Sequence, residues 1–216
     1  PVYYFTVTAL TDPSDQDATA ASSSQIDLSW AADASAHQVM IVRKLSTDSW
    51  TEPTQGTSYS VNDVIGSGIV VYKGFGTSFG NTGLSANTTY DYKFYSENYD
   101  YYSVGVTAQA TTQLPNIIIN EVDADQTGTD AAEFIELYDG GVGNSSLNGF
   151  VVVLFNGSTD VSYAAFDLDG YVTNANGYFV LGNTNVPNVG LIFSNDLLQN
   201  GQDAVALYYS DATSFP

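Results

Sequence analysis

Apolar and polar residues alternate along most of the chain, and the spacing typical of amphipathic helices is hard to find. Alternation at a period of two places apolar side chains on one face of a β-strand. In the first half, strands are predicted over residues 25–30, 37–44, 68–75, 90–98 and 102–112. In the second half, strands are predicted at "NIIINEV", "EFIELY", "GFVVVLF", "VSYAAFDL", "GYFVLG" and "DAVALYY". The pattern predicts an all-β protein.

The residues between these runs favour tight turns. Gly, Asn, Asp and Ser separate the predicted strands at the short intervals typical of β-sandwiches. Four Asn-Gly pairs, which tolerate the positive φ angles of tight hairpins, occur at 148–149, 156–157, 176–177 and 200–201. Segment 74–83 contains four glycines but no Gly-Lys-Ser or Gly-Lys-Thr, so we interpret it as a mobile hairpin and not as a phosphate loop.

A domain boundary is predicted near residue 113. The segment 110–116, "ATTQLPN", ends a polar strand and continues into Leu114-Pro115, which is a short, stiff connector. The charge also changes there. All four Lys and Arg residues precede the boundary, where 4 cations and 11 acids give −7; the remainder has 13 acids and no cation, which gives −13. We therefore predict two domains, 1–113 and 114–216.

This charge balance excludes some partners. The whole chain has a formal net charge of −20. Binding to a nucleic-acid backbone depends on Lys and Arg, so we expect no nucleic-acid partner, and anionic membrane surfaces are disfavoured for the same reason.

No apolar run approaches the ~20 residues of a membrane helix, so we expect no membrane insertion. The first residues, "PVYYFTVTAL", lack the basic and apolar regions of a signal peptide. The absence of cysteine excludes disulfides, thiolate catalysis and Cys-ligated metals.

Several residues of the first half match a known domain type. Trp30 ends the run "IDLSW", and Leu84 and Tyr90 bracket the run "LSANTTY". With these residues, 1–113 resembles a fibronectin type III domain. The resemblance implies a sandwich in which Trp30 packs in the core and the Tyr90 hydroxyl bonds back to the backbone, like the tyrosine corner of related sandwiches. The segment 46–80 is longer and richer in glycine than is usual in that family.

The second half matches another domain type in five blocks that occur in the expected order. The blocks are "IINEV", "EFIELY", "LNGFVVV", "GYFVLG" and "LQNGQDAVALY". On these blocks, residues 114–216 resemble a lamin tail domain of the bacterial, secreted type. The resemblance implies a second Ig-like sandwich, which in bacteria accompanies nucleases, phosphatases or surface anchors in exported proteins. The resemblance to lamin tail domains implies no catalytic residue. Both resemblances together imply two consecutive Ig-like β-sandwiches.

The residues that carry chemistry are few. His37 is the single histidine and opens a strand-like run, and no Gly-x-Ser-x-Gly elbow is present. The 24 acidic residues supply many carboxylate pairs, but nothing selects one as a glycosidase pair. We therefore expect no catalytic residue and no enzymatic activity. Alternation assigns about half of the rings in the run 90–103 to the core. The remaining rings, those of Tyr99, Tyr101 and Tyr102, are candidates for stacking on sugars.

The loop "DADQTGTDAAEF" is a candidate calcium site. Oxygen-bearing side chains occupy alternate positions before Gly128, as in a calcium loop, although no helices flank it. Without sulfur or a nearby histidine, zinc has poor ligands, and magnesium prefers fewer protein oxygens. An acidic, solvated turn is the alternative interpretation. A backbone carbonyl near Thr127 or Thr129 completes the predicted site. Its side-chain ligands are Asp123, Asp125, Asp130 and Glu133.

These observations predict a non-catalytic segment of an exported bacterial protein, located at the cell surface or outside the cell. Its expected role is spacing, adhesion or binding of a protein or glycan partner. One alternative is the accessory module of a secreted hydrolase, such as a nuclease or phosphatase, whose catalytic domain lies elsewhere. A second alternative is a structural subunit that self-associates into filaments through edge strands.

Overall fold

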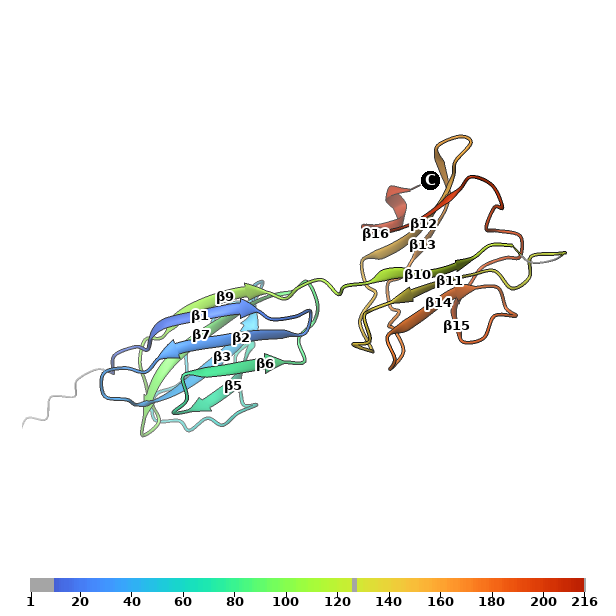
Figure 1. Ribbon diagram of the computed structural model, residues 1–216. Coiled ribbons are helices and arrows are strands. Elements are labelled where there is room, and N and C mark those ends of the chain that lie inside the picture. Colours follow the sequence, from blue (N-terminus) through green and yellow to red (C-terminus); the bar gives the residue numbers. More distant parts are fainter. Residues whose placement is uncertain (1–9, 126–127, 216) are drawn as a thin grey trace, which may run out of the picture. The chain divides into compact units, whose positions relative to one another are not determined.

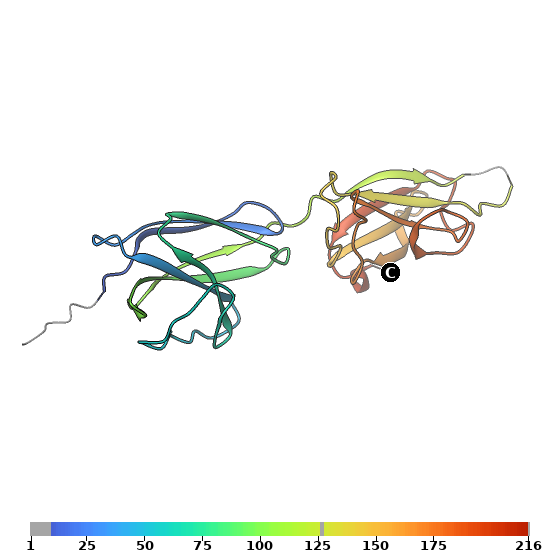
Figure 2. The ribbon, with the colours of Figure 1, turned by 90° about the horizontal axis from the view of Figure 1, so that it is seen from below.

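The computed structural model describes residues 10–125 and 128–215 of the protein. Within them, every regular element is a β-strand except one short 3-10 helix, so the prediction of an all-β fold is confirmed. The chain divides into two compact units, Pro1–Leu114 and Pro115–Pro216. In each unit, two layers of strands face one another across an apolar core (Figures 1 and 2).

Residues 10–114, the described part of the first unit, form nine strands in two sheets (Figure 1). One sheet has the order β1-β2-β6, and the other has the order β4-β5-β3-β7-β8, with β9 also pairing with β7. The strands are β1 Ser14–Ala20, β2 Gln25–Ala31, β3 Gln38–Leu45, β4 Val64–Ile65, β5 Gly68–Gly74, β6 Ser78–Thr82, β7 Thr89–Asn98, β8 Tyr101–Tyr102 and β9 Val106–Thr111.

The core of the first unit lies between these sheets. Trp30 is buried there, with its ring 5.7 Å from that of Phe94. Leu84 and Tyr90 are also buried, and the Ser85 backbone N–H donates a 3.0 Å hydrogen bond to the Tyr90 hydroxyl. The tyrosine therefore joins the core to the loop before its own strand, as the sequence resemblance implied.

The central strand β3 is buried on both faces. Val39 and Ile41 pack into the core between the sheets, whereas Met40 and Val42 point to the opposite side. There they meet Ile65, Val70, Tyr95 and Tyr102 in a second apolar cluster, against which Trp50 and Tyr59 pack. The long segment 46–63 therefore covers the outer face of this sheet, which gives its unusual length a structural role.

The interpretation of 74–83 as a hairpin was wrong. Residues Ser78–Thr82 form β6, which pairs with β2 in one sheet, whereas the preceding strand β5 pairs with β3 in the other. The segment thus passes from one layer to the other. Phe79 packs against the core, which anchors this glycine-containing strand.

In the second unit, residues 115–125 and 128–215 form two sheets, with the orders β10-β11-β14-β15 and β13-β12-β16 (Figure 1). Among these described residues, twelve buried apolar side chains fill the space between the sheets, including Ile135, Leu137 and Leu154. The elements are β10 Ile118–Asp123, β11 Phe134–Tyr138, β12 Phe150–Asn156, β13 Val161–Asp167, β14 Tyr178–Gly182, β15 Val189–Ile192, β16 Ala204–Tyr209 and the 3-10 helix η1 Ala212–Ser214.

Candidate functional site

A hollow with a volume of about 400 Å³ lies where β3 begins and where β5 and β7 end. The strand register brings its three segments together, because Gln38 pairs with Glu97 and Val39 pairs with Gly74. We call this hollow the cup. It is lined by Ala36, His37, Gln38, Lys73, Phe75, Glu97, Asn98, Tyr99 and Asp100.

Two aromatic rings of the cup are exposed to solvent. Phe75 is 76% exposed and Tyr99 is 88% exposed. A single exposed aromatic residue is ordinary on a protein surface. Two of them lining one hollow form an apolar surface that is available to a ligand, because neither ring is used to fill the core.

Tyr99 occupies an unfavourable backbone conformation. Tyr99 and Asp100 connect β7 to β8 and have φ angles of 49° and 65°. Two central residues with positive φ define a type I′ hairpin turn, which favours Asn and Gly and not a large aromatic residue. The left-handed conformation costs roughly 1–2 kcal/mol for a residue with a Cβ atom. The sequence thus places a strained, exposed tyrosine where a smaller residue would fit better, as is often found at functional sites.

Buried polar groups form the wall of the cup below this turn. The Glu97 side chain is almost fully buried; its Oε1 atom accepts a 2.8 Å hydrogen bond from the Asp100 backbone N–H. Its Oε2 atom accepts a hydrogen bond from the Gln38 amide and lies 3.7 Å from Lys73 Nζ. Lys73 Nζ also donates to the Tyr59 carbonyl oxygen, at 3.1 Å. These contacts hold the Tyr99-Asp100 turn in place. They also fix hydrogen-bond donors and acceptors of Gln38, Lys73 and Glu97 at the wall of the cup.

His37 is held by the buried carboxylate of Asp33. Its Nδ1 atom lies 2.7 Å from Asp33 Oδ2, and its backbone N–H donates to Oδ1 at 2.9 Å. Burial opposes ionisation of Asp33, but the hydrogen bonds and charge of His37 and a bond from Thr11 outweigh it and lower the pKa of Asp33. The Nδ1–H group that faces the carboxylate leaves Nε2 as the ring atom directed away from Asp33. No Ser, Thr or Cys is among the described residues that line the cup.

The structure separates the three tyrosines proposed from the sequence. Tyr99 lines the cup, and Tyr101 is exposed on β8 outside it. The prediction for Tyr102 was wrong, because its ring is buried against Tyr95 and Tyr59 in the second apolar cluster. Lys73, Phe75 and Glu97 were missed, because Glu97 lies 22 or more residues after the other two and meets them only through the pairing of β5 and β7 with β3.

The predicted calcium ligands are distributed around the β10–β11 connection. Asp123 ends β10, and Asp125 follows it at the surface. Asp130 accepts a hydrogen bond from the Asn200 side chain, and Glu133 accepts bonds from the Leu197 and Leu198 backbone N–H groups. Thr127 lies outside the described residues. Across residues 10–125 and 128–215, no three Asp, Glu or His side chains are grouped closely enough to hold a metal ion. Calcium binding stays a prediction.

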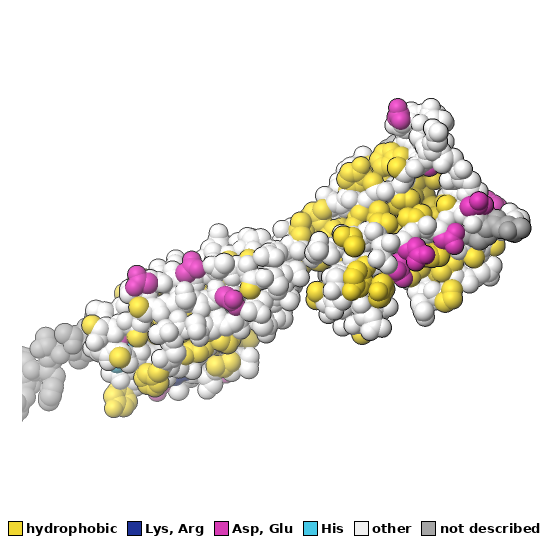
Figure 3. Space-filling model, viewed as in Figure 1, with side chains coloured by type: hydrophobic (Ala, Val, Ile, Leu, Met, Phe, Trp, Pro, Cys, Tyr) yellow, Lys and Arg dark blue, Asp and Glu magenta, His cyan; other side chains and the backbone are white. Residues whose placement is uncertain are grey.

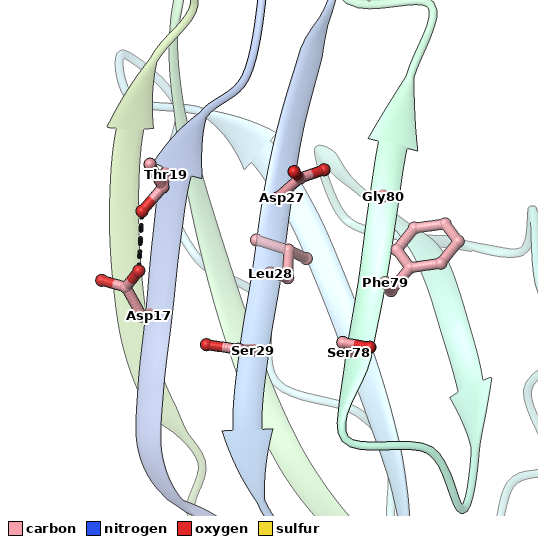
Figure 4. Close-up of a pocket in the computed structure, with 8 residues that line it drawn as sticks. All are labelled: Asp17, Thr19, Asp27, Leu28, Ser29, Ser78, Phe79 and Gly80. Carbon is pink, nitrogen blue, oxygen red and sulfur yellow. Dashed lines mark hydrogen bonds between the residues drawn. The ribbon is translucent and has the colours of Figure 1, made fainter.

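A second hollow, with a volume of about 670 Å³, lies over β1, β2 and β6 (Figure 4). No exposed aromatic ring stands over it, since Phe79 packs against the core. Thr19 Oγ1 donates a 2.7 Å hydrogen bond to Asp17 Oδ2, as is common on a solvated sheet face. The hollow is therefore a weaker candidate than the cup. Its exposed side chains are those of Asp17, Thr19, Asp27, Ser29 and Ser78.

Comparison with known proteins gives structural neighbours only. No protein family and no curated protein match the sequence. A two-domain fibronectin type III segment of chicken tenascin has a TM-score of 0.47 and 11% identity, over 93% of this chain and 100% of that one. The FN1–FN3 domains of chicken CNTN1 have a TM-score of 0.35 and 14% identity, over 91% and 60%. The crystal structure of FN3tt has a TM-score of 0.35 and 17% identity, over 47% and 92%.

These neighbours are fibronectin type III domains at low sequence identity. The resemblance of the second unit to a lamin tail domain stays a prediction. Among the described residues, no helix is long and apolar enough to cross a membrane.

Proposed function

We propose that this chain is a non-catalytic binding segment of an exported, multidomain bacterial protein, and that its cup binds a neutral glycan at the cell surface or outside the cell. One observation carries the proposal: two exposed aromatic rings line a hollow whose wall holds fixed hydrogen-bonding groups, and one ring is presented by a strained turn. Natural sequences retain such strain where a site needs it.

The chemistry of the cup favours a sugar over other ligands with flat faces. Pyranose rings offer apolar C–H faces to aromatic side chains and hydroxyl groups that both donate and accept hydrogen bonds. The wall supplies matching groups of both kinds, from Gln38, Asn98 and Lys73. Nucleic-acid bases also stack on aromatic rings, but their phosphates require cations, and this chain has a net charge of −20. The Glu97 carboxylate is paired with Lys73, so the cup does not demand a cationic ligand.

The proposal predicts that an alanine substitution of either ring weakens glycan binding. Neutral oligosaccharides of the β-glucan, chitin and mannan types are titrated separately into the full chain and followed by calorimetry. We expect one type to bind, and we expect Phe75→Ala and Tyr99→Ala each to weaken its binding about tenfold or more, equivalent to about 1.4 kcal/mol.

Tyr101→Ala is the matched control, because Tyr101 is also an exposed tyrosine, two residues after Tyr99, but does not line the cup. It should bind as the native chain does. Equal losses in all three variants would contradict the assignment of the site. Binding of choline but of no sugar would show instead that the cup is a cage for quaternary ammonium groups.

A second prediction concerns the trade-off between stability and binding at the turn. Tyr99→Asn should raise the free energy of unfolding of the first unit by about 1 kcal/mol, because Asn tolerates the left-handed conformation and the exposed tyrosine ring makes few contacts. The same variant should lose glycan binding. Both tryptophans, Trp30 and Trp50, lie in the first unit, so urea unfolding followed by tryptophan fluorescence reports on this unit alone.

Tyr101→Asn again serves as the control, since Tyr101 has the extended conformation of a strand and gains nothing from Asn. If Tyr99→Asn destabilised the first unit, the turn would not be strained and the tyrosine would have a structural role.

A further inference from the structure

Four Asn-Gly pairs, at 148–149, 156–157, 176–177 and 200–201, open this chain to a spontaneous modification of asparagine. The backbone nitrogen of the residue that follows an asparagine can attack the side-chain Cγ atom, which gives a five-membered succinimide ring and releases ammonia. Water then opens the ring to aspartate or to isoaspartate. Glycine favours the attack, because it has no Cβ atom to hinder the approach and its backbone reaches more conformations. The conformation of each pair in the folded chain therefore decides which asparagine reacts.

In three of the pairs, a hydrogen bond holds the attacking nitrogen. Gly149 N–H donates to Asp169 Oδ1 at 2.6 Å. Gly157 N–H donates to Asp203 Oδ1 at 2.8 Å. Gly177 is buried, and its N–H donates to a backbone carbonyl oxygen within its own turn, at 2.9 Å. The nitrogen must lose its proton and turn toward Cγ before it can attack, so each of these bonds has to break first.

The fourth pair, Asn200-Gly201, is held differently. Both residues are exposed, in the segment between the buried Leu198 and strand β16. Across residues 10–125 and 128–215, no acceptor takes a hydrogen bond from Gly201 N–H. The Asn200 side chain donates a 3.0 Å hydrogen bond from Nδ2 to Asp130 Oδ2. This bond engages the nitrogen that the reaction releases and not the Cγ atom that is attacked.

We propose that Asn200 is the preferred site of deamidation in the folded chain, and that its conversion to a carboxylate loosens the contact of residues 196–200 with the β10–β11 connection. A bond forms between Gly201 N and Asn200 Cγ as the Cγ–Nδ2 bond breaks. The proton of the Gly201 amide leaves with Nδ2 as ammonia, and one water molecule opens the ring. No oxidant, reductant or other reactant is needed. The site lies in the second unit and does not depend on the cup.

Residues 196–200 are joined to the β10–β11 connection by several hydrogen bonds. Asp196 N–H donates to the Asp130 carbonyl oxygen at 3.0 Å, and Asp130 N–H donates to Asp196 Oδ1 at 3.1 Å. The Glu133 carboxylate accepts bonds from two backbone N–H groups of the same segment, both at 3.0 Å. The bond from Asn200 to Asp130 is the last of this series.

A carboxylate at position 200 cannot donate this last bond. Its negative charge would instead face the Asp130 carboxylate at close range, and two like charges at that distance repel one another. The surroundings add to the repulsion, because β10 and β11 carry acidic residues and Figure 3 shows acidic side chains gathered near these strands. Isoaspartate also lengthens the main chain by one carbon atom. Both products therefore favour separation of the two segments.

Peptide mapping by mass spectrometry tests the site. The full chain is incubated at mildly alkaline pH and digested with pepsin in acid, and each Asn-Gly peptide is followed as its amide is replaced by a carboxyl group. We expect Asn200 to react several-fold faster than the asparagines of the other three pairs. In guanidinium chloride, where the protecting hydrogen bonds are lost, the four rates should converge. A folded chain in which another pair reacts as fast, or a ranking that persists in guanidinium chloride, would overturn the proposal.

Gly201→Ala is the matched variant, because a Cβ atom hinders the attack on Asn200. The nearest atom to the new Cβ is the side-chain oxygen Asp203 Oδ2, at 3.2 Å, and a small shift relieves this contact. Deamidation of Asn200 should slow several-fold, whereas the other three pairs should keep their rates. An unchanged rate at Asn200 would show that the loss of ammonia does not proceed through attack by Gly201.

Hydrogen exchange tests the consequence. Asn200→Asp should accelerate the exchange of residues 128–133 several-fold. Asn176→Asp is the control: it adds the same charge to another exposed asparagine of the second unit, whose side chain makes no hydrogen bond within the part of the chain that the structure describes. It should leave this exchange unchanged. Equal exchange in the two variants would overturn the proposed loosening.

Discussion

Replacing Glu133 with alanine is expected to destabilise the second unit by about 3–5 kcal/mol, the usual cost of breaking a buried, hydrogen-bonded charge network. Its side chain is inaccessible to solvent. Oε1 accepts a hydrogen bond from Leu198 N–H and Oε2 accepts one from Leu197 N–H, both at 3.0 Å. The Asn183 side chain approaches Oε2 at 3.5 Å and accepts a 2.7 Å bond from the Glu133 backbone N–H. Alanine would remove the acceptor of the Leu197 and Leu198 N–H groups, whereas the Asn183 amide would keep its bond to the Ser194 carbonyl oxygen.

Glu133→Gln is the matched variant, because its amide oxygen still accepts one of these bonds while its NH₂ group faces the donors. We expect a smaller loss, about 1–2 kcal/mol. The two tryptophans again provide an internal reference, since their fluorescence transition reports on the first unit. Hydrogen exchange of residues 115–216 should accelerate in Glu133→Ala while the tryptophan transition stays unchanged. A second unit that kept its native protection would show that the carboxylate is dispensable.

Glu133 also shows why the sequence predicted a calcium loop but could not identify the actual partners of its carboxylates. A calcium-loop motif compares only residues that are close to one another in the sequence. The recorded partners of the Glu133 carboxylate are Asn183, Leu197 and Leu198, which lie 50 to 65 residues away. A carboxylate that binds a cation and one that binds backbone N–H groups have the same sequence signature, because both are oxygen acceptors in an acidic segment.

The alternation of apolar residues predicted most of the strands that face the core, although not β6, because burial on one face imposes a period of two. It missed β1, "SDQDATA", whose hydrogen bonds to β2 place a mostly polar strand at a sheet edge. The run "VMIV" in β3 reads as a strand, but nothing in it shows that segment 46–63 covers its second face. In the cup, Tyr99 was a candidate because alternation did not assign its ring to the core, whereas no sequence pattern pointed to Glu97.

Asp139 is a second carboxylate on which the folding of a loop depends. It follows β11 and is buried. Its two oxygens accept hydrogen bonds from the backbone N–H groups of Gly141, Val142 and Gly143 at 2.9–3.0 Å, and Thr173 Oγ1 donates to Oδ2 at 2.7 Å. The positive φ angles of Gly141 and Gly143 allow these successive N–H groups to converge on one anion. Burial alone would raise the pKa of Asp139, but these hydrogen bonds outweigh it and lower the pKa below its usual value.

Asp139→Ala should therefore cost the second unit about 3 kcal/mol at neutral pH, because it removes the acceptor shared by three loop N–H groups and the buried Thr173 hydroxyl. Asp139→Asn should cost less and should reveal the pH dependence. Because the folded-state pKa of Asp139 is below the unfolded value of about 3.9, the ionised side chain stabilises the fold fully above that value and loses its contribution as pH falls through the folded-state pKa. The difference in free energy of unfolding between the native chain and Asp139→Asn should thus be constant near neutral pH and shrink below about pH 4. Urea unfolding followed by circular dichroism over this pH range measures the difference, with tryptophan fluorescence separating the first unit. A difference that stayed constant down to the lowest pH would mean that the charge on Asp139 contributes nothing and that shape alone holds the loop.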